Sequence, residues 1–133
     1  MYLRHIQMTR ALERLSRLRQ SLARLRDEAN QLLEVFLERT PLVRGTVYDL
    51  RRTCGKPSCG CATAGRRHAV TVLSVSEAGH TRLRAIPSDQ IPELRALTAR
   101  YRRFRRARAR LVTVHRTMVA VIDQLAAARR RER

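Results

Sequence analysis

Apolar residues recur at alternating steps of three and four residues in two long segments of the chain. In residues 1–40 the repeat has seven members: Leu15, Leu18, Leu22, Leu25, Ala29, Leu32 and Phe36. A period of 3.5 residues is typical of a coiled-coil seam. The pattern predicts a first long helix that ends before Pro41, because a proline cannot continue the helical hydrogen-bond ladder.

A second segment, residues 88–130, repeats the same alternation. Its members are Leu94, Leu97, Tyr101, Phe104, Arg108, Leu111, His115, Met118, Ile122 and Leu125. Arg108 and His115 interrupt the apolar seam, and polar members of this kind either set register or reach solvent. Two long apolar seams are buried by each other or by a second chain. The sequence therefore predicts an antiparallel helical hairpin, with a homodimer through the helices as the alternative pairing.

The residues between the two helical segments have a different pattern. The segments 44–53 and 69–76 are rich in β-branched residues, 81–86 alternates polar and apolar residues, and Gly79 suits a hairpin turn. We predict three short antiparallel strands. The predicted fold is mainly α with a small β insert, as a single domain over 1–133. It comprises a helix at 1–40, a β unit at 44–87 and a basic helix at 88–130.

Three cysteines and a histidine lie within the β unit, spaced as Cys54-x4-Cys59-x-Cys61-x6-His68. Zinc binds four nitrogen or sulfur ligands, and three cysteines with one histidine form a known structural set. A structural zinc ion would stabilise three strands that are marginal alone. His80 is the alternative fourth ligand. Three reduced thiols without a ligand role are the main alternative to zinc, and an iron–sulfur cluster would usually need a fourth cysteine.

The chain carries a net charge of +18, and Lys56 is its only lysine among 29 basic residues. A GC-rich genome accounts for part of this arginine bias. Residues 98–133 hold twelve arginines against Asp123 and Glu132, whereas solvated helix faces normally mix both signs. Such a surface attracts nucleic acid, DNA more than RNA, or else an acidic protein partner. The candidate phosphate contacts are Arg51, Arg52, Lys56, Arg66, Arg67, Arg102, Arg103, Arg105 and Arg106.

Other classes of function find little support in the sequence. The acidic residues of the central region are scattered, so we expect no enzymatic activity and no small-molecule substrate. The N-terminal residues lack the apolar core of a signal peptide, and no segment approaches the roughly 20 apolar residues of a membrane span. Three clustered cysteines do not suggest a secreted disulfide framework. We expect a cytoplasmic protein without a membrane partner.

The segments RGTVYDLRRTCGKPSCGCATAGRRH and IPSDQIPELRALTARYRRFRR resemble a small prokaryotic family catalogued only as a domain of unknown function. The resemblance covers residues 44–106, and the residues that fit its motif are Cys54, Gly55, Lys56, Pro57, Cys59, Cys61 and His68. Ala69 to Val72 stand where the family usually has Gly-Pro and aromatic residues. The family implies no activity, but its occurrence near mobile-element genes hints at DNA. The sequence thus predicts a non-enzymatic nucleic-acid-binding accessory protein, or alternatively a coiled-coil interaction module.

Overall fold

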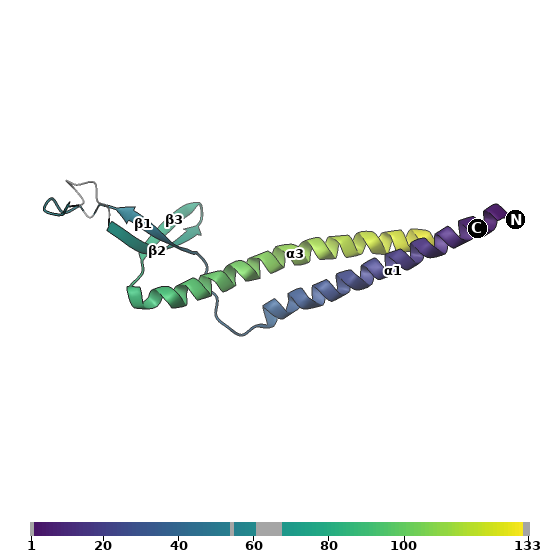
Figure 1. Ribbon diagram of the computed structural model, residues 1–133, viewed down its shortest axis with the longest axis horizontal. Helices are drawn as coiled ribbons and strands as arrows, with labels where there is room; N and C mark the ends of the chain where they lie inside the picture. The colour runs from purple at the N-terminus through teal and green to yellow at the C-terminus, as the bar shows by residue number, and fades with distance from the viewer. Residues whose placement is uncertain (1, 54, 61–67, 132–133) are drawn as a thin grey trace. The chain divides into compact units, whose positions relative to one another are not determined.

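The computed structural model describes residues 2–53, 55–60 and 68–131 of the chain (Figure 1). Its elements are α1 (Tyr2–Leu37), β1 (Thr46–Arg52), β2 (His68–Glu77), β3 (His80–Ala85), the 3-10 turn η1 (Ser88–Gln90) and α3 (Ile91–Arg129). The predicted fold class is confirmed. The chain forms two long packed helices, and the segment that connects them in sequence forms a three-stranded antiparallel sheet.

The chain divides into two compact units. The helical pair consists of Met1–Glu38 and Phe104–Arg133, and the sheet unit consists of Arg39–Arg103. The division falls within α3, so the first turns of that helix belong to the sheet unit and the rest to the helical pair. The single-domain assignment stays a prediction.

The predicted seam of α1 is confirmed. Ala29 is buried, and the other six seam positions are half-buried. At one end of the helical pair the rings of Phe36 and Phe104 meet edge to face, with centroids 4.9 Å apart. The small side chain of Ala29 lets the two helix backbones approach each other closely, as close-packed interiors require.

The predicted register of the α3 seam is wrong after Phe104, although Arg108 and His115 reach solvent, which is one of the two outcomes expected for them. Arg108, His115 and Ile122 are exposed, and the covered residues lie one position earlier along the chain. The observed seam is Phe104, Ala107, Leu111, Val114, Met118, Val121, Leu125 and Ala128. It keeps the same alternation of three and four while leaving a guanidinium and an imidazole in water, which avoids their desolvation. Val114, only 1% exposed, is the most buried apolar side chain of the pair.

The three predicted strands form one antiparallel sheet in the order β1-β2-β3. In the register of β1 and β2, Asp49 faces Thr71, whose hydroxyl donates a 2.7 Å hydrogen bond to the Asp49 carboxylate. Ala78 and Gly79 connect β2 to β3 with φ angles of 50° and 80°. Two successive residues with positive φ are typical of a type I′ hairpin turn, which matches the right-handed twist of the strands.

The sheet unit has a small core of Val72, Leu73, Ile86 and Thr98. The Thr98 hydroxyl is satisfied inside the helix, where it donates to the Leu94 carbonyl at 2.8 Å. Two contacts tie the first turns of α3 to the rest of the unit: the Val43 N–H donates to the Leu97 carbonyl at 3.3 Å, and Arg95 pairs with Asp49 at 3.6 Å.

Candidate nucleic-acid interface and metal site

Two of the four predicted metal ligands lie together at one end of the sheet. The Cys59 Sγ atom is 3.0 Å from His68 Nε2, and His68 is the first residue of β2. Cys59 is half-buried, and its N–H donates to the Lys56 carbonyl at 3.1 Å, which closes a tight turn. The other two predicted ligands, Cys54 and Cys61, lie outside the described residues.

The pair of Cys59 and His68 fits the chemistry of a zinc site. Zinc–sulfur and zinc–nitrogen bonds of ~2.3 and ~2.0 Å place two ligands of one tetrahedral ion about 3.5 Å apart. The observed sulfur–nitrogen distance of 3.0 Å is close to this separation. Within the described residues no three His, Cys, Asp or Glu side chains assemble, and that part of the chain includes only two of the four predicted ligands.

His80 does not belong to this cluster. It pairs with Glu77 at the far end of β2, whereas His68 begins that strand. Nine strand residues at ~3.3 Å each separate the two histidines by about 30 Å. The alternative in which His80 completes the metal site is therefore wrong, and His68 is the histidine that can act with Cys59.

Three of the predicted basic contacts surround the same end of the sheet. Arg51 and Arg52 are exposed at the end of β1, and Arg52 lies opposite His68 in the register. Lys56 is exposed in the turn closed by Cys59. Arg66 and Arg67, the other two predicted contacts of this region, lie outside the described residues. The described part thus holds three cationic side chains close to the metal-ligand pair.

The other predicted basic contacts, Arg102, Arg103, Arg105 and Arg106, are all exposed on α3. At about 100° per residue, Arg102, Arg105 and Arg106 point away from the side that carries Phe104. In the described part of the chain, no carboxylate lies within ion-pair distance of Arg102, Arg105 or Arg106. These three guanidiniums are available to an external anion.

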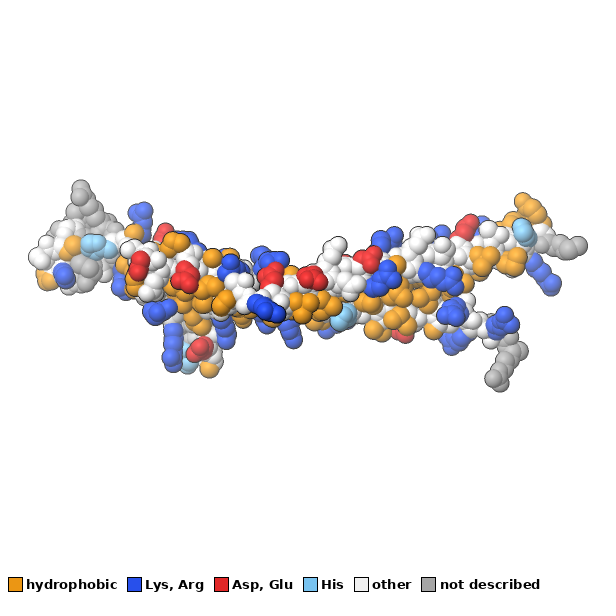
Figure 2. All heavy atoms as spheres, turned by 90° about the horizontal axis from the view of Figure 1, so that it is seen from below, with side chains coloured by type: hydrophobic (Ala, Val, Ile, Leu, Met, Phe, Trp, Pro, Cys, Tyr) orange, Lys and Arg blue, Asp and Glu red, His pale blue; other side chains and the backbone are white. Residues whose placement is uncertain are grey.

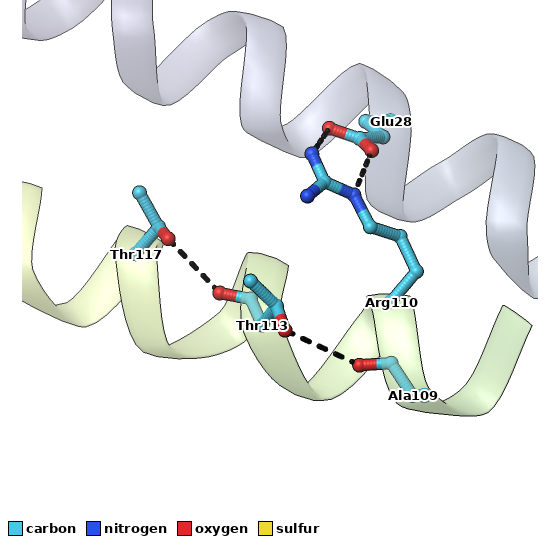
Figure 3. A network of polar contacts seen from close by, with 5 residues as sticks. All are labelled: Glu28, Ala109, Arg110, Thr113 and Thr117. Atoms are coloured by element: carbon cyan, nitrogen blue, oxygen red, sulfur yellow. Dashed lines mark hydrogen bonds and ion pairs between the residues drawn. The ribbon is translucent and has the colours of Figure 1, made fainter. Parts of the chain in front are cut away.

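Arg110, by contrast, is paired within the protein. Its guanidinium donates two hydrogen bonds to the Glu28 carboxylate, at 2.5 and 3.0 Å, and so links α3 to α1 (Figure 3). These hydrogen bonds lower the pKa of Glu28 and raise the pKa of Arg110. Arg110 therefore has a structural partner, whereas Arg102, Arg105 and Arg106 have no ion-pair partner among the described residues.

The sheet unit also contains a cleft of about 250 Å³. It is lined by Arg44, Gly45, Thr46, Ser74, Ser76, Tyr101 and Arg102. The Arg44 guanidinium donates to the Ser76 carbonyl at 2.7 Å, which fixes its position. Two guanidiniums and several hydroxyls, with no carboxylate among the lining residues, form a set of donors suited to a phosphate group.

Sequence reasoning missed Arg44. It is an isolated arginine before β1, and the residues that share its cleft come from β2 and α3. No local pattern marks such a site, because the cleft forms only when three distant segments meet. Gly45 beside it has a φ of 137°, and a Cβ there would lie 2.8 Å from the Ser74 carbonyl oxygen. Glycine therefore permits the close approach of β1 and β2 that shapes the cleft.

Comparison with known protein families identifies the chain. The family described as "Domain of unknown function (DUF6788)" matches residues 8–96, about two thirds of the sequence. The chain belongs to the DUF6788 family. No curated protein and no solved structure matches it.

The DUF6788 match extends further toward the N-terminus than the resemblance noted in the sequence, and it ends earlier. It includes most of α1 and all three strands, and it stops within the first turns of α3. Arg44, Cys59 and His68 fall inside the DUF6788 span, while Tyr101 and Arg102 fall outside it. The arginine-rich part of α3 lies beyond the matched region.

Proposed function

We propose that this DUF6788 protein is a non-enzymatic accessory protein that binds nucleic acid through phosphate contacts. A mobile-element context suits such a role. The observation that carries the proposal is the cleft lined by Arg44 and Arg102 together with hydroxyl groups and without a carboxylate. Arg binds phosphate with bidentate geometry, so a backbone phosphate seated in this cleft would satisfy both guanidiniums.

The arginines that follow on α3 extend this surface. Arg102 and Arg106 are one helical turn apart, about 6 Å, and both are exposed. A nucleic-acid strand that follows α3 from Arg102 would meet Arg105 and Arg106 within about one turn of the same helix. Phosphate contacts supply affinity and position without reading sequence, so we expect binding with little sequence preference.

Arg51, Arg52 and Lys56 supply a second group of contacts. Arg51 and Arg52 end β1, and Arg52 lies six strand residues, or about 20 Å, from Thr46. Lys56 follows shortly after the end of the strand. A nucleic acid that touches both groups spans the length of the sheet. This separation supports an extended ligand rather than a single small anion.

We propose that Cys54, Cys59, Cys61 and His68 hold a structural zinc ion. The proximity of Cys59 and His68 supports this assignment, and bound zinc would fix the segment that displays Lys56 beside Arg51 and Arg52. The zinc has no catalytic role in this proposal. It stabilises the end of the sheet from which the second group of contacts projects.

A salt titration with matched variants tests the nucleic-acid proposal. We expect the affinity for a fluorescent DNA duplex, measured by anisotropy on nuclease-treated protein, to fall steeply as salt rises. The triple variant R102Q/R105Q/R106Q should reduce the slope of log K against log salt by up to about 3, near 0.9 for each lost phosphate contact. The cleft variant R44Q should lower affinity further when combined with it.

The matched control removes the same charge elsewhere. The variant R10Q/R14Q/R17Q neutralises three exposed arginines of α1 and should retain most of the wild-type affinity and slope. Equal losses in the two triple variants would mean that only total charge matters, and the localised interface would be wrong. No binding by the wild-type protein at low salt would overturn the nucleic-acid function and favour an acidic protein partner.

A further inference from the structure

A second apolar stripe runs along α3 outside its seam with α1. Its apolar members are Val112, Val119, Ile122 and Ala126; the polar His115 completes the alternating steps of three and four, and all five are exposed. Val119 is 57% exposed and Ile122 is 48% exposed. A coiled-coil repeat that faces solvent is typical of a surface that packs against another helix.

The helical pair has one apolar side and one polar side. The stripe borders a cleft lined by Arg19, Leu22, Ala23, Arg26, Met118 and Ile122. Leu12 and Leu33 of α1 lie one heptad away from Arg19 and Arg26 and so share this side, where they are 60% and 43% exposed. Hydrophobic side chains are seen along the helical pair in Figure 2.

The opposite side of the pair carries a cleft lined by Ser21, Arg24, Leu25, Glu28, Thr117 and Val121. It also carries the contacts of Glu28 with Arg110 and of Thr117 with the Thr113 carbonyl (Figure 3). Exposed apolar residues are therefore concentrated on one side of the pair. This asymmetry gives the pair a single surface for association.

Packing against α1 leaves much of the apolar surface of α3 uncovered. Over an 18-residue stretch of this helix, 11% is buried. By length and composition α3 could cross a membrane, a criterion that helices of soluble proteins also meet. Exposed apolar surface of this kind is typical of a site that binds a partner.

The charges along the stripe indicate which partner fits. Residues 111–128 contain only two charged side chains, Arg116 and Asp123, spaced one heptad apart. Both are exposed beside the stripe, and neither has an ion-pair partner in the described part of the chain. If two copies of α3 pack antiparallel about a point near Val119, Arg116 of each copy lies opposite Asp123 of the other. A parallel pairing would instead place like charges together.

We propose that two copies of this chain associate through these stripes, with their α3 helices antiparallel. Val119 and Ile122 form the centre of the interface, and two ion pairs between Arg116 and Asp123 flank it. The arrangement is a four-helix assembly that uses a side of the helical pair other than the one that carries Glu28 and Arg110. It is independent of nucleic-acid binding.

Net charge gives the dimer an unusual salt dependence. Each chain carries +18, so two copies repel each other at low ionic strength, and salt screens this repulsion. We expect dimerisation to tighten from about 0.15 M to about 1 M salt. Nucleic-acid binding should weaken over the same range, so the two activities are separable in one experiment.

Sedimentation equilibrium on nuclease-treated protein tests the surface. We expect a dimer in high salt for the wild type and a monomer for V119S/I122S, which removes the apolar centre without changing charge. The control variant Y2S/L3S alters two apolar residues that are also exposed, at 79% and 75%, but lie at the start of α1 away from the side that carries Leu12 and Leu33, and it should remain dimeric. A monomeric wild type in both salts, or equal weakening by the two double variants, would overturn the proposal.

Charge reversal tests the antiparallel orientation. R116D and D123R should each weaken dimerisation by about tenfold or more, because each places two pairs of like charges across the interface. The combined variant R116D/D123R restores opposite charges and should dimerise like the wild type. Failure of this rescue would contradict the antiparallel pairing. Monomeric protein that floats with phospholipid vesicles through the same stripe would assign the surface to a membrane and overturn the proposal.

Discussion

The helical pair and the sheet unit reach stability by different means. The pair has a long seam that repeats every few residues, and its most buried members are small: Ala29, Ala107, Val114 and Val121. Among its described residues, the sheet unit buries three apolar side chains: Val72, Leu73 and Ile86. Many equivalent contacts support the first unit, whereas the second depends on a few particular residues.

The difference suggests how each unit should respond to change. Loss of one seam contact should destabilise the helical pair little, because many other contacts of the long interface remain. A buried charge, in contrast, should destabilise the pair at any position of the seam. In the sheet unit, a metal ligand or a glycine has no neighbour that can replace it. The largest effects should therefore come from the segment that holds Cys59 and His68.

Removal of the metal should produce the largest effect. We expect one zinc per chain in the wild type and none in C59S or H68Q, with unfolding of the sheet unit, because binding at structural zinc sites contributes on the order of 10 kcal/mol to folding. Elemental mass spectrometry measures the zinc, and near-ultraviolet circular dichroism of the tyrosines follows the fold. The helical signal should largely persist, since α1 and most of α3 belong to the other unit.

His80 provides the control for the metal prediction. It lies on the same sheet but about 30 Å from His68, so H80Q should keep both zinc and stability. Wild-type protein that is folded, reduced and free of metal would contradict the zinc site. The stability of the sheet unit would then have to come from its small apolar core alone.

A charge in the seam should come next. Val114 is 1% exposed, and V114D would bury a carboxylate without a partner, at a cost of about 3–5 kcal/mol. V119D places the same group on the same helix at an exposed position and should change the stability of the monomer little. Urea denaturation at low protein concentration compares the two. Equal destabilisation would mean that α3 uses a different seam.

The sequence predicted the period of α3 but not its register. Leu111, Met118 and Leu125 belong both to the predicted seam and to the observed one. The two seams differ in whether Val114 or His115, and whether Val121 or Ile122, is covered by α1. Both choices give a 3.5-residue repeat, so periodicity alone cannot distinguish them. Burial of the less polar set decides the matter, and the rejected set marks the stripe that we assign to dimerisation.

The candidate site was predictable only where it is local in sequence. Cys59 and His68 follow from their spacing, and Arg102 to Arg106 follow from the charge of one helix. Arg44 does not, because its cleft partners Ser76 and Tyr101 come from two other elements. Contacts between distant segments leave no periodic pattern in the sequence, so the cleft could be found only from the structure.

Gly45 offers a smaller test of the sheet unit. A side chain there meets the Ser74 carbonyl at 2.8 Å and the backbone has a φ of 137°, so G45A should destabilise the unit by about 1–3 kcal/mol. Gly79 also has a positive φ, of 80°, but open space around it, so G79A should cost less. Thermal denaturation ranks the two. A larger loss in G79A would mean that backbone conformation outweighs the close approach of the strands.

The smallest effect should come from the ion pair between Glu28 and Arg110, because both groups are exposed and screened by salt. The hydrogen bonds from Arg110 lower the pKa of Glu28 below 4.5 in the folded protein, so the contribution is complete at neutral pH and disappears as pH falls through that lowered value. We expect E28Q to lower the melting temperature slightly at pH 7 and not at a pH below the lowered pKa of Glu28.

The control E34Q removes an exposed carboxylate of the same helix that has no ion-pair partner among the described residues, and it should leave the melting temperature unchanged at both pH values. High salt should reduce the difference in melting temperature between E28Q and the wild type. A difference that persists at low pH or in high salt would show that Glu28 supports the helical pair through packing of its side chain. The helical pair would then depend on particular residues as the sheet unit does.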